Sequence, residues 1–72
     1  MMKITDVRSK IKSNIIFGYQ DFRHLFDEML DEAEKGLQEG LDDLGLTEND
    51  TYAPEQAKYL IDKAMGFALD VI

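Results

Sequence analysis

The sequence has no cysteine and no tryptophan, a single proline, a single histidine, and 8 basic side chains against 15 acidic ones. Without cysteine, the chain can form no disulfide and offers no thiolate nucleophile or metal ligand. No segment approaches the roughly 18 consecutive apolar residues of a membrane span, and MMKITDVRSKIK lacks the apolar stretch of a secretory signal. We therefore expect an intracellular, cytoplasmic protein that does not enter a membrane.

The excess of acidic residues gives a formal net charge of −7. This charge argues against direct binding of nucleic acid, because affinity for that polyanion comes mainly from Lys and Arg on phosphates. The length of 72 residues predicts one domain spanning residues 1–72. A chain this short buries only roughly 60% of its unfolded surface, so we expect oligomerisation or a partner to supplement its small core.

Apolar residues recur at helical spacing in three segments, and alternation typical of strands is nearly absent. The first helix is expected at 5–17, capped by Thr5 or Asp6, and the second at 21–44, capped by Asp21. The third is expected at 54–71. The predicted apolar stripes comprise Ile4, Val7, Ile11 and Ile15; then Phe22, Leu25, Phe26, Met29, Leu30, Ala33, Leu37, Leu41 and Leu44; then Ala57, Leu60, Ile61, Ala64, Met65, Ala68 and Val71.

Each predicted helix has one apolar stripe to bury, which favours an all-α fold, a small antiparallel three-helix bundle. Gly45 is placed to stop the second helix and Pro54 to start the third. Ile16 and Phe17 point away from the first stripe and need another surface to cover them. Because the second helix is predicted to be twice as long as the first, we also expect its far end to be uncovered. The residues expected to mediate self-association, as in a homodimer, are Ile16, Phe17, Leu37, Leu41 and Leu44.

The negative charge is concentrated in the middle of the chain, where residues 21–50 hold eleven acidic side chains against Arg23 and Lys35. Residues 1–20 hold four basic side chains and one acidic one. Nine of the acids lie on the polar face of the predicted second helix, roughly one per 4 Å of its length. A single nucleic-acid strand carries about one charge per 3.4 Å. The face is therefore interpreted either as a surface that binds a polycation or as a solvated face that keeps the protein soluble.

No constellation of residues typical of catalysis or metal binding is present. His24 has Asp21, Asp27 and Glu28 within helical reach, but a zinc site with one histidine and no cysteine would need carboxylates for its other ligands. No second histidine is available to orient a catalytic base, and the carboxylates share one solvated face, whereas acid–base catalysis needs two in different environments. We expect no enzyme, no metal and no cofactor.

Two further features remain open to two interpretations each. Gly36 and Gly40 form a G-x-x-x-G spacing that lets another helix approach, either Phe67 or another bulky neighbour inside the bundle or a helix of another molecule. Tyr59 points away from the third stripe, either as an interface residue or as one of the exposed aromatics that are common on surfaces.

These observations predict a non-enzymatic interaction protein that inhibits or regulates a partner by occupying the partner's basic, nucleic-acid-binding surface. In size and charge the chain resembles phage-encoded inhibitors of host defence, including anti-CRISPR and anti-restriction proteins, an analogy that rests on no residue motif. The alternative is a self-associating structural or adaptor protein whose acidity serves solubility. The residues expected to bind the partner are Asp27, Glu28, Asp31, Glu32, Glu34, Glu39, Asp42, Asp43 and Tyr59.

Overall fold

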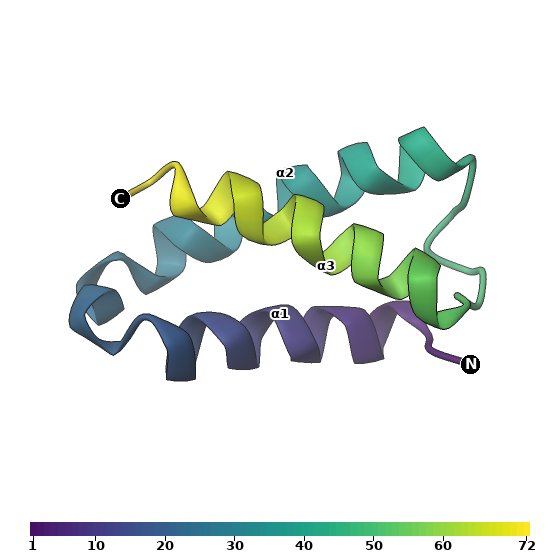
Figure 1. Ribbon diagram of the computed structural model, residues 1–72. Coiled ribbons are helices and arrows are strands. Elements are labelled where there is room, and N and C mark those ends of the chain that lie inside the picture. Colours follow the sequence, from purple (N-terminus) through teal and green to yellow (C-terminus); the bar gives the residue numbers. More distant parts are fainter.

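The computed structural model describes residues 1–72 and shows an all-α fold. Helix α1 spans Ile4–Gly18, a short 3₁₀ helix η1 spans Gln20–Leu25, helix α2 spans Phe26–Leu44, and helix α3 spans Pro54–Leu69. Each long helix runs antiparallel to the one before it, and the three lie side by side in an elongated bundle (Figure 1). The predicted antiparallel three-helix bundle is confirmed. No helix has both the length and the apolar composition needed to cross a bilayer.

Helix α2 begins at Phe26 rather than at Asp21, because residues 20–25 form η1 instead of α-helix. Phe22 interrupts regular helix geometry with φ −112° and ψ 23°, and Leu25 precedes α2 with φ −102° and ψ 9°. Asp21 makes no capping hydrogen bond, contrary to the prediction. With 19 residues, α2 is only slightly longer than α1 with 15 and α3 with 16.

The helix N-termini are closed by side chains that lie inside the first turn. The backbone amide of Lys3 donates a hydrogen bond to Asp6 Oδ2 at 2.9 Å, so α1 begins at Ile4 and Asp6 is not its cap residue. The backbone amide of Ala53 likewise donates to Gln56 Oε1 at 2.9 Å. In both cases a residue three positions into the helix satisfies an amide that the helix itself leaves without a partner.

The loop between α2 and α3 is tied to the N-terminal segment. It starts at Gly45, whose φ of 66° lies in the left-handed region that favours glycine, and ends at Pro54 in the first position of α3, as predicted. Tyr52 is fully buried within it and exchanges two backbone hydrogen bonds with Met2, at 2.8 and 3.2 Å. The Tyr52 hydroxyl donates to the carbonyl of Thr47 at 2.6 Å. Burial raises the pKa of this phenol.

Helices α2 and α3 lie closest together because α2 presents glycine at the contact. A Cβ atom built on Gly36 would lie 2.7 Å from the carbonyl oxygen of Lys63 and 3.0 Å from Phe67 Cδ1. One built on Gly40 would lie 3.0 Å from Leu60 Cδ2. Both glycines are buried, so the G-x-x-x-G spacing serves a contact inside the bundle, the first of its two interpretations.

Twelve buried apolar side chains from the three helices and the loop form the core. They are Val7, Ile11, Ile15, Met29, Ala33, Leu37, Leu41, Tyr52, Ala57, Leu60, Ala64 and Ala68. Leu37 and Leu41, which were expected to mediate self-association, are only 0% and 2% exposed, and Leu44 is half-buried. The prediction was wrong for Leu37 and Leu41 because it assumed a second helix much longer than its neighbours. Of that set, only Ile16 and Phe17 stay exposed.

Candidate functional site

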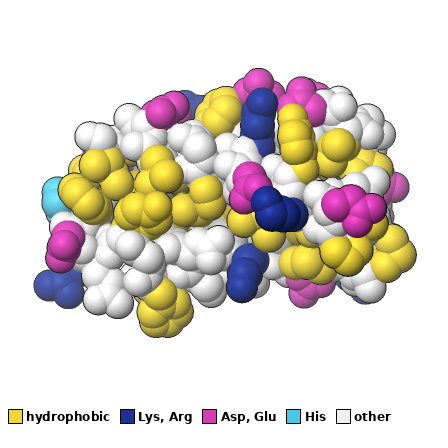
Figure 2. All heavy atoms as spheres, in the orientation of Figure 1, with side chains coloured by type: hydrophobic (Ala, Val, Ile, Leu, Met, Phe, Trp, Pro, Cys, Tyr) yellow, Lys and Arg dark blue, Asp and Glu magenta, His cyan; other side chains and the backbone are white.

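The acidic side chains of α2 project from the face opposite its buried residues. Its inner face consists of Met29, Ala33, Gly36, Leu37, Gly40 and Leu41. At about 100° per residue, Asp31 and Asp42 lie on the opposite side, with other acids on both flanks. Acidic side chains accordingly appear along the outer edge of the bundle, over α2 (Figure 2). Basic residues of α1 and α3 form ion pairs with some of these carboxylates and leave others unpaired.

On the flank that faces α1, Glu34 is held by a basic residue of that helix. Arg8 donates to Glu34 from Nε at 3.0 Å and from Nη2 at 2.8 Å, and also reaches Glu48 at 2.5 Å. Gln38 donates a further hydrogen bond to Glu34 at 2.8 Å. The hydrogen bond from Arg8 lowers the pKa of the Glu34 carboxyl. Glu34 is therefore committed within the molecule and is a poor candidate for contact with a partner.

On the flank that faces α3, two more carboxylates are partly neutralised. Lys63 lies 3.5 Å from Glu39 Oε1 and 3.4 Å from Asp43 Oδ2. The hydroxyl of Tyr59 donates to the same Asp43 oxygen at 2.7 Å, which lowers the pKa of Asp43 and raises that of Tyr59. Tyr59 is 40% exposed, so its ring stays accessible while its hydroxyl is occupied.

Between the two flanks, Asp27, Glu28 and Asp31 form an acidic ridge without a direct ion-pair partner; Lys35, which pairs with Glu32, also attracts the carboxylate of Asp31. All three side chains are exposed, and none forms an ion pair or side-chain hydrogen bond. Asp42 is equally unpaired but lies about 16 Å further along the helix. Glu32, beside the ridge, pairs with Lys35 at 2.5 Å.

The cross-helix ion pairs reduce the free charge that the sequence predicted. Four unpaired carboxylates between residues 27 and 42 amount to roughly one per 6 Å of α2, and no longer match the one per 3.4 Å of a nucleic-acid strand. The three carboxylates of the ridge lie within about 6 Å along the axis. The free charge is thus local, at the first turns of α2, rather than distributed along the helix.

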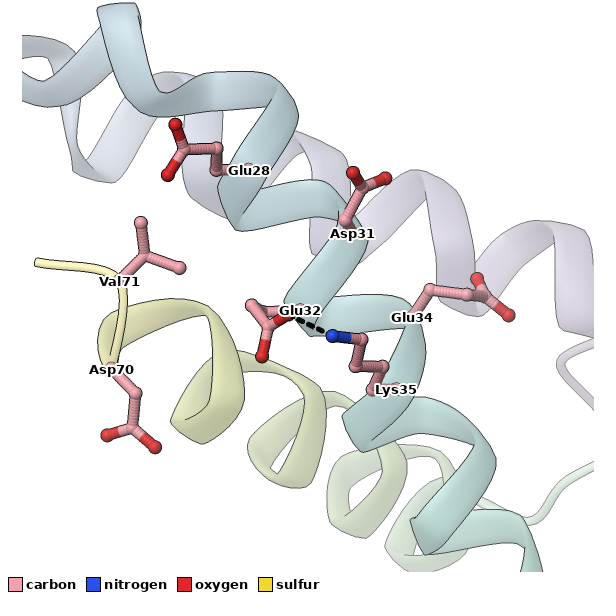
Figure 3. Close-up of a pocket in the computed structure, with 7 residues that line it drawn as sticks. All are labelled: Glu28, Asp31, Glu32, Glu34, Lys35, Asp70 and Val71. Carbon is pink, nitrogen blue, oxygen red and sulfur yellow. Dashed lines mark hydrogen bonds and ion pairs between the residues drawn. The ribbon is translucent and has the colours of Figure 1, made fainter.

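A shallow hollow of about 660 Å³ adjoins this ridge, between α2 and the end of α3. Its lining residues are Glu28, Asp31, Glu32, Glu34, Lys35, Asp70 and Val71. Val71 lies on the side nearer α2, whereas the carboxylate of Asp70 points away from α2 and Glu34 points toward α1 (Figure 3). The carboxylates that border this solvent-open space thus come mainly from α2, in Glu28, Asp31 and Glu32, an arrangement suited to a guanidinium or ammonium group.

The remaining residues considered from sequence do not converge on a chemical site. His24 is exposed on η1, and no three His, Asp or Glu side chains lie close enough together to hold a metal ion. The chain matches no protein-family model, no curated protein and no solved structure. The sequence interpretation missed the roles of Arg8 and Lys63, although the surplus of basic residues before position 20 was a signal that α1 could neutralise part of α2.

Proposed function

We propose that this chain is a non-enzymatic interaction protein, cytoplasmic in location, that inhibits or regulates a partner by occupying its basic, nucleic-acid-binding surface. The observation that carries the proposal is the acidic ridge. Three adjacent carboxylates that form no direct ion pair repel one another at helical spacing, at a cost of a few tenths of a kcal/mol for each close pair. Burial against Lys or Arg of a partner would remove that repulsion and steer the association.

The ion pairs of α2 limit which of its carboxylates are free to contact a partner. Glu34, Glu39 and Asp43 already have cationic neighbours, so we assign the main contact to the acidic ridge and the hollow beside it. Glu32 then lies beside the contact, whereas Asp42 lies outside it. Tyr59 lies outside it as well, because its hydroxyl binds Asp43 near the other end of α2.

The test compares two charge-reversed variants with the same change in net charge. Asp27→Lys with Asp31→Lys alters the ridge, whereas Glu55→Lys with Asp62→Lys alters exposed positions on α3. Each immobilised protein is presented with cell extract at low and high salt, and captured proteins are identified by mass spectrometry. We expect the wild type and the α3 variant to capture a nucleic-acid-binding protein, and competition with that protein's own nucleic acid to release it. Equal capture by the ridge variant, with helicity unchanged in circular dichroism, would contradict the proposal.

The second candidate function is that of a self-associating structural or adaptor protein. The observation that favours it is the exposure of Phe17, of which 73% is accessible in the single chain. An aromatic side chain buries about 150–250 Å² when a partner covers it, which makes it one of the largest single contributors to an interface. The two functions use separate surfaces, because the acidic hollow and the surroundings of Phe17 share no lining residue.

A further inference from the structure

The end of the bundle where α1 passes into η1 exposes apolar surface. Phe17 and Ile16 are 73% and 42% exposed, because both point away from the buried stripe that ends at Ile15. The neighbouring Phe26 and Tyr19 are only partly covered by the core.

Phe17 stands between two hollows of different character. The larger, of about 460 Å³, is mostly apolar and is lined by Ile15, Ile16, Phe17, Tyr19, Gln20, Arg23 and Phe26. The smaller, of about 300 Å³, is lined by Phe17, Gly18, Tyr19, Gln20, Asp21 and Phe22. The larger hollow contains one charged residue, Arg23, and the smaller contains one, Asp21. A projecting aromatic ring and an apolar recess thus lie next to each other on one surface.

Two charged residues of opposite sign, Arg23 and Asp21, lie at this surface. Arg23 and Asp21 are both exposed, and neither forms an ion pair within the chain. They line different hollows, and Phe17 lines both. An occupant that complements this surface brings an apolar projection together with an acidic residue for Arg23 and a basic residue for Asp21. This chain itself carries that combination, in Phe17 with Asp21 and Arg23.

We propose that a second copy of this chain docks here in a two-fold symmetric dimer. Phe17 of each copy enters the larger hollow of the other, and Asp21 of each copy pairs with Arg23 of the other, because a two-fold axis makes every contact reciprocal. A recess of this volume lies within the range of about 300–1,000 Å³ that is typical of binding pockets. The acidic ridge remains outside the contact, so the dimer presents two copies of it to a partner.

The size of the surface sets the expected affinity. The whole chain exposes 4612 Å², and a stable interface takes about 800 Å² from each partner, far more than Phe17, Ile16 and their hollow supply. The dimer is therefore expected to be reversible and to form only at concentrations approaching about 1 mM.

The test measures the dimer dissociation constant by sedimentation equilibrium up to about 1 mM. Asp21→Arg and Arg23→Asp are each expected to weaken the dimer roughly tenfold, since each sets two like charges against each other twice in the interface. The double variant Asp21→Arg with Arg23→Asp restores both pairs in exchanged positions and is expected to recover wild-type affinity. Asp21→Arg also lowers the net negative charge, which by itself would favour association, so its weakening isolates the local contact.

Phe17→Asp is expected to leave the chain monomeric, whereas Ile72→Asp, which places the same charge on an exposed residue of neither hollow, should dimerise like the wild type. A wild type that stays monomeric at about 1 mM overturns the proposal. A double variant no better than the single ones also overturns it. Neither outcome affects the capture experiment on the acidic ridge, so the two proposals fail separately.

Discussion

Arg8 of α1 and Glu34 of α2 form a two-pronged hydrogen-bonded ion pair, with Nε at 3.0 Å from Oε1 and Nη2 at 2.8 Å from Oε2. The same guanidinium reaches Glu48 beyond the end of α2. Helix α1 lies further from α2 than α3 does, so this pair is a specific polar link at the looser of the two contacts of α2. It also removes one carboxylate from the surface that a partner could contact.

Replacing Arg8 by methionine is expected to lower the free energy of unfolding by about 1 kcal/mol, since a partly exposed but bidentate pair is worth more than a simple surface ion pair. Lys58→Met is the matched control, because Lys58 pairs with Asp62 at 2.8 Å in full exposure. That variant should cost clearly less than Arg8→Met. Urea denaturation of both measures the difference, and equal losses would show that the link to Glu34 contributes nothing special.

The same pair makes stability depend on pH. Arg8 lowers the pKa of Glu34 below its ordinary value of 4.5, so the folded state favours the charged carboxylate more than the unfolded state does. The resulting stabilisation is complete above that ordinary value and is lost as the pH falls through the lower folded pKa. The wild type should therefore lose more stability than Arg8→Met on going from about pH 6 to about pH 3. Parallel pH profiles from thermal melts of the two proteins would refute this account.

Replacing glycine by alanine is expected to change stability in opposite directions at Gly36 and at Gly66. Gly36→Ala adds a Cβ atom 2.9 Å from the Cα atom of Ala64, and should destabilise the fold by about 1–3 kcal/mol despite the better helix propensity of alanine. Gly66→Ala meets nothing within 4 Å on an exposed position of α3, and should stabilise by about 0.5–1 kcal/mol. Melting temperatures that move in the same direction for both would disprove the close approach of α2 and α3.

Removing the Tyr52 hydroxyl tests how the loop is held. Tyr52→Phe leaves the buried ring in place but deprives the carbonyl of Thr47 of its donor, so we expect a loss of about 1 kcal/mol. Tyr52→Ala should cost about 3–5 kcal/mol, since it also empties a fully buried site. Chemical denaturation separates the two contributions. The Tyr59→Phe variant is the control, and because the Tyr59 hydroxyl is bonded at the surface, its removal should leave stability almost unchanged.

The burial of Tyr52 could not be predicted from patterns in the sequence. This residue belongs to no helical stripe, and its burial depends on a backbone pairing with Met2, fifty positions away. The same holds for Asp21, which resembles a helix cap in the sequence but lies inside η1. Local residue preferences predict a helix start at Asp21, whereas α2 begins five residues later, at Phe26.

The amino-acid sequence was sufficient to predict the three helices, the stop at Gly45, the start at Pro54 and the exposure of Ile16 and Phe17. These properties follow from the periodicity of apolar residues and the backbone preferences of glycine and proline, which act within a few residues. The packing of the helices against one another makes Leu37 and Leu41 core residues and lets Arg8 and Lys63 neutralise the flanks of α2. Such contacts depend on which helices are neighbours and in what register, because Coulomb attraction and burial act across space between residues that are remote in sequence.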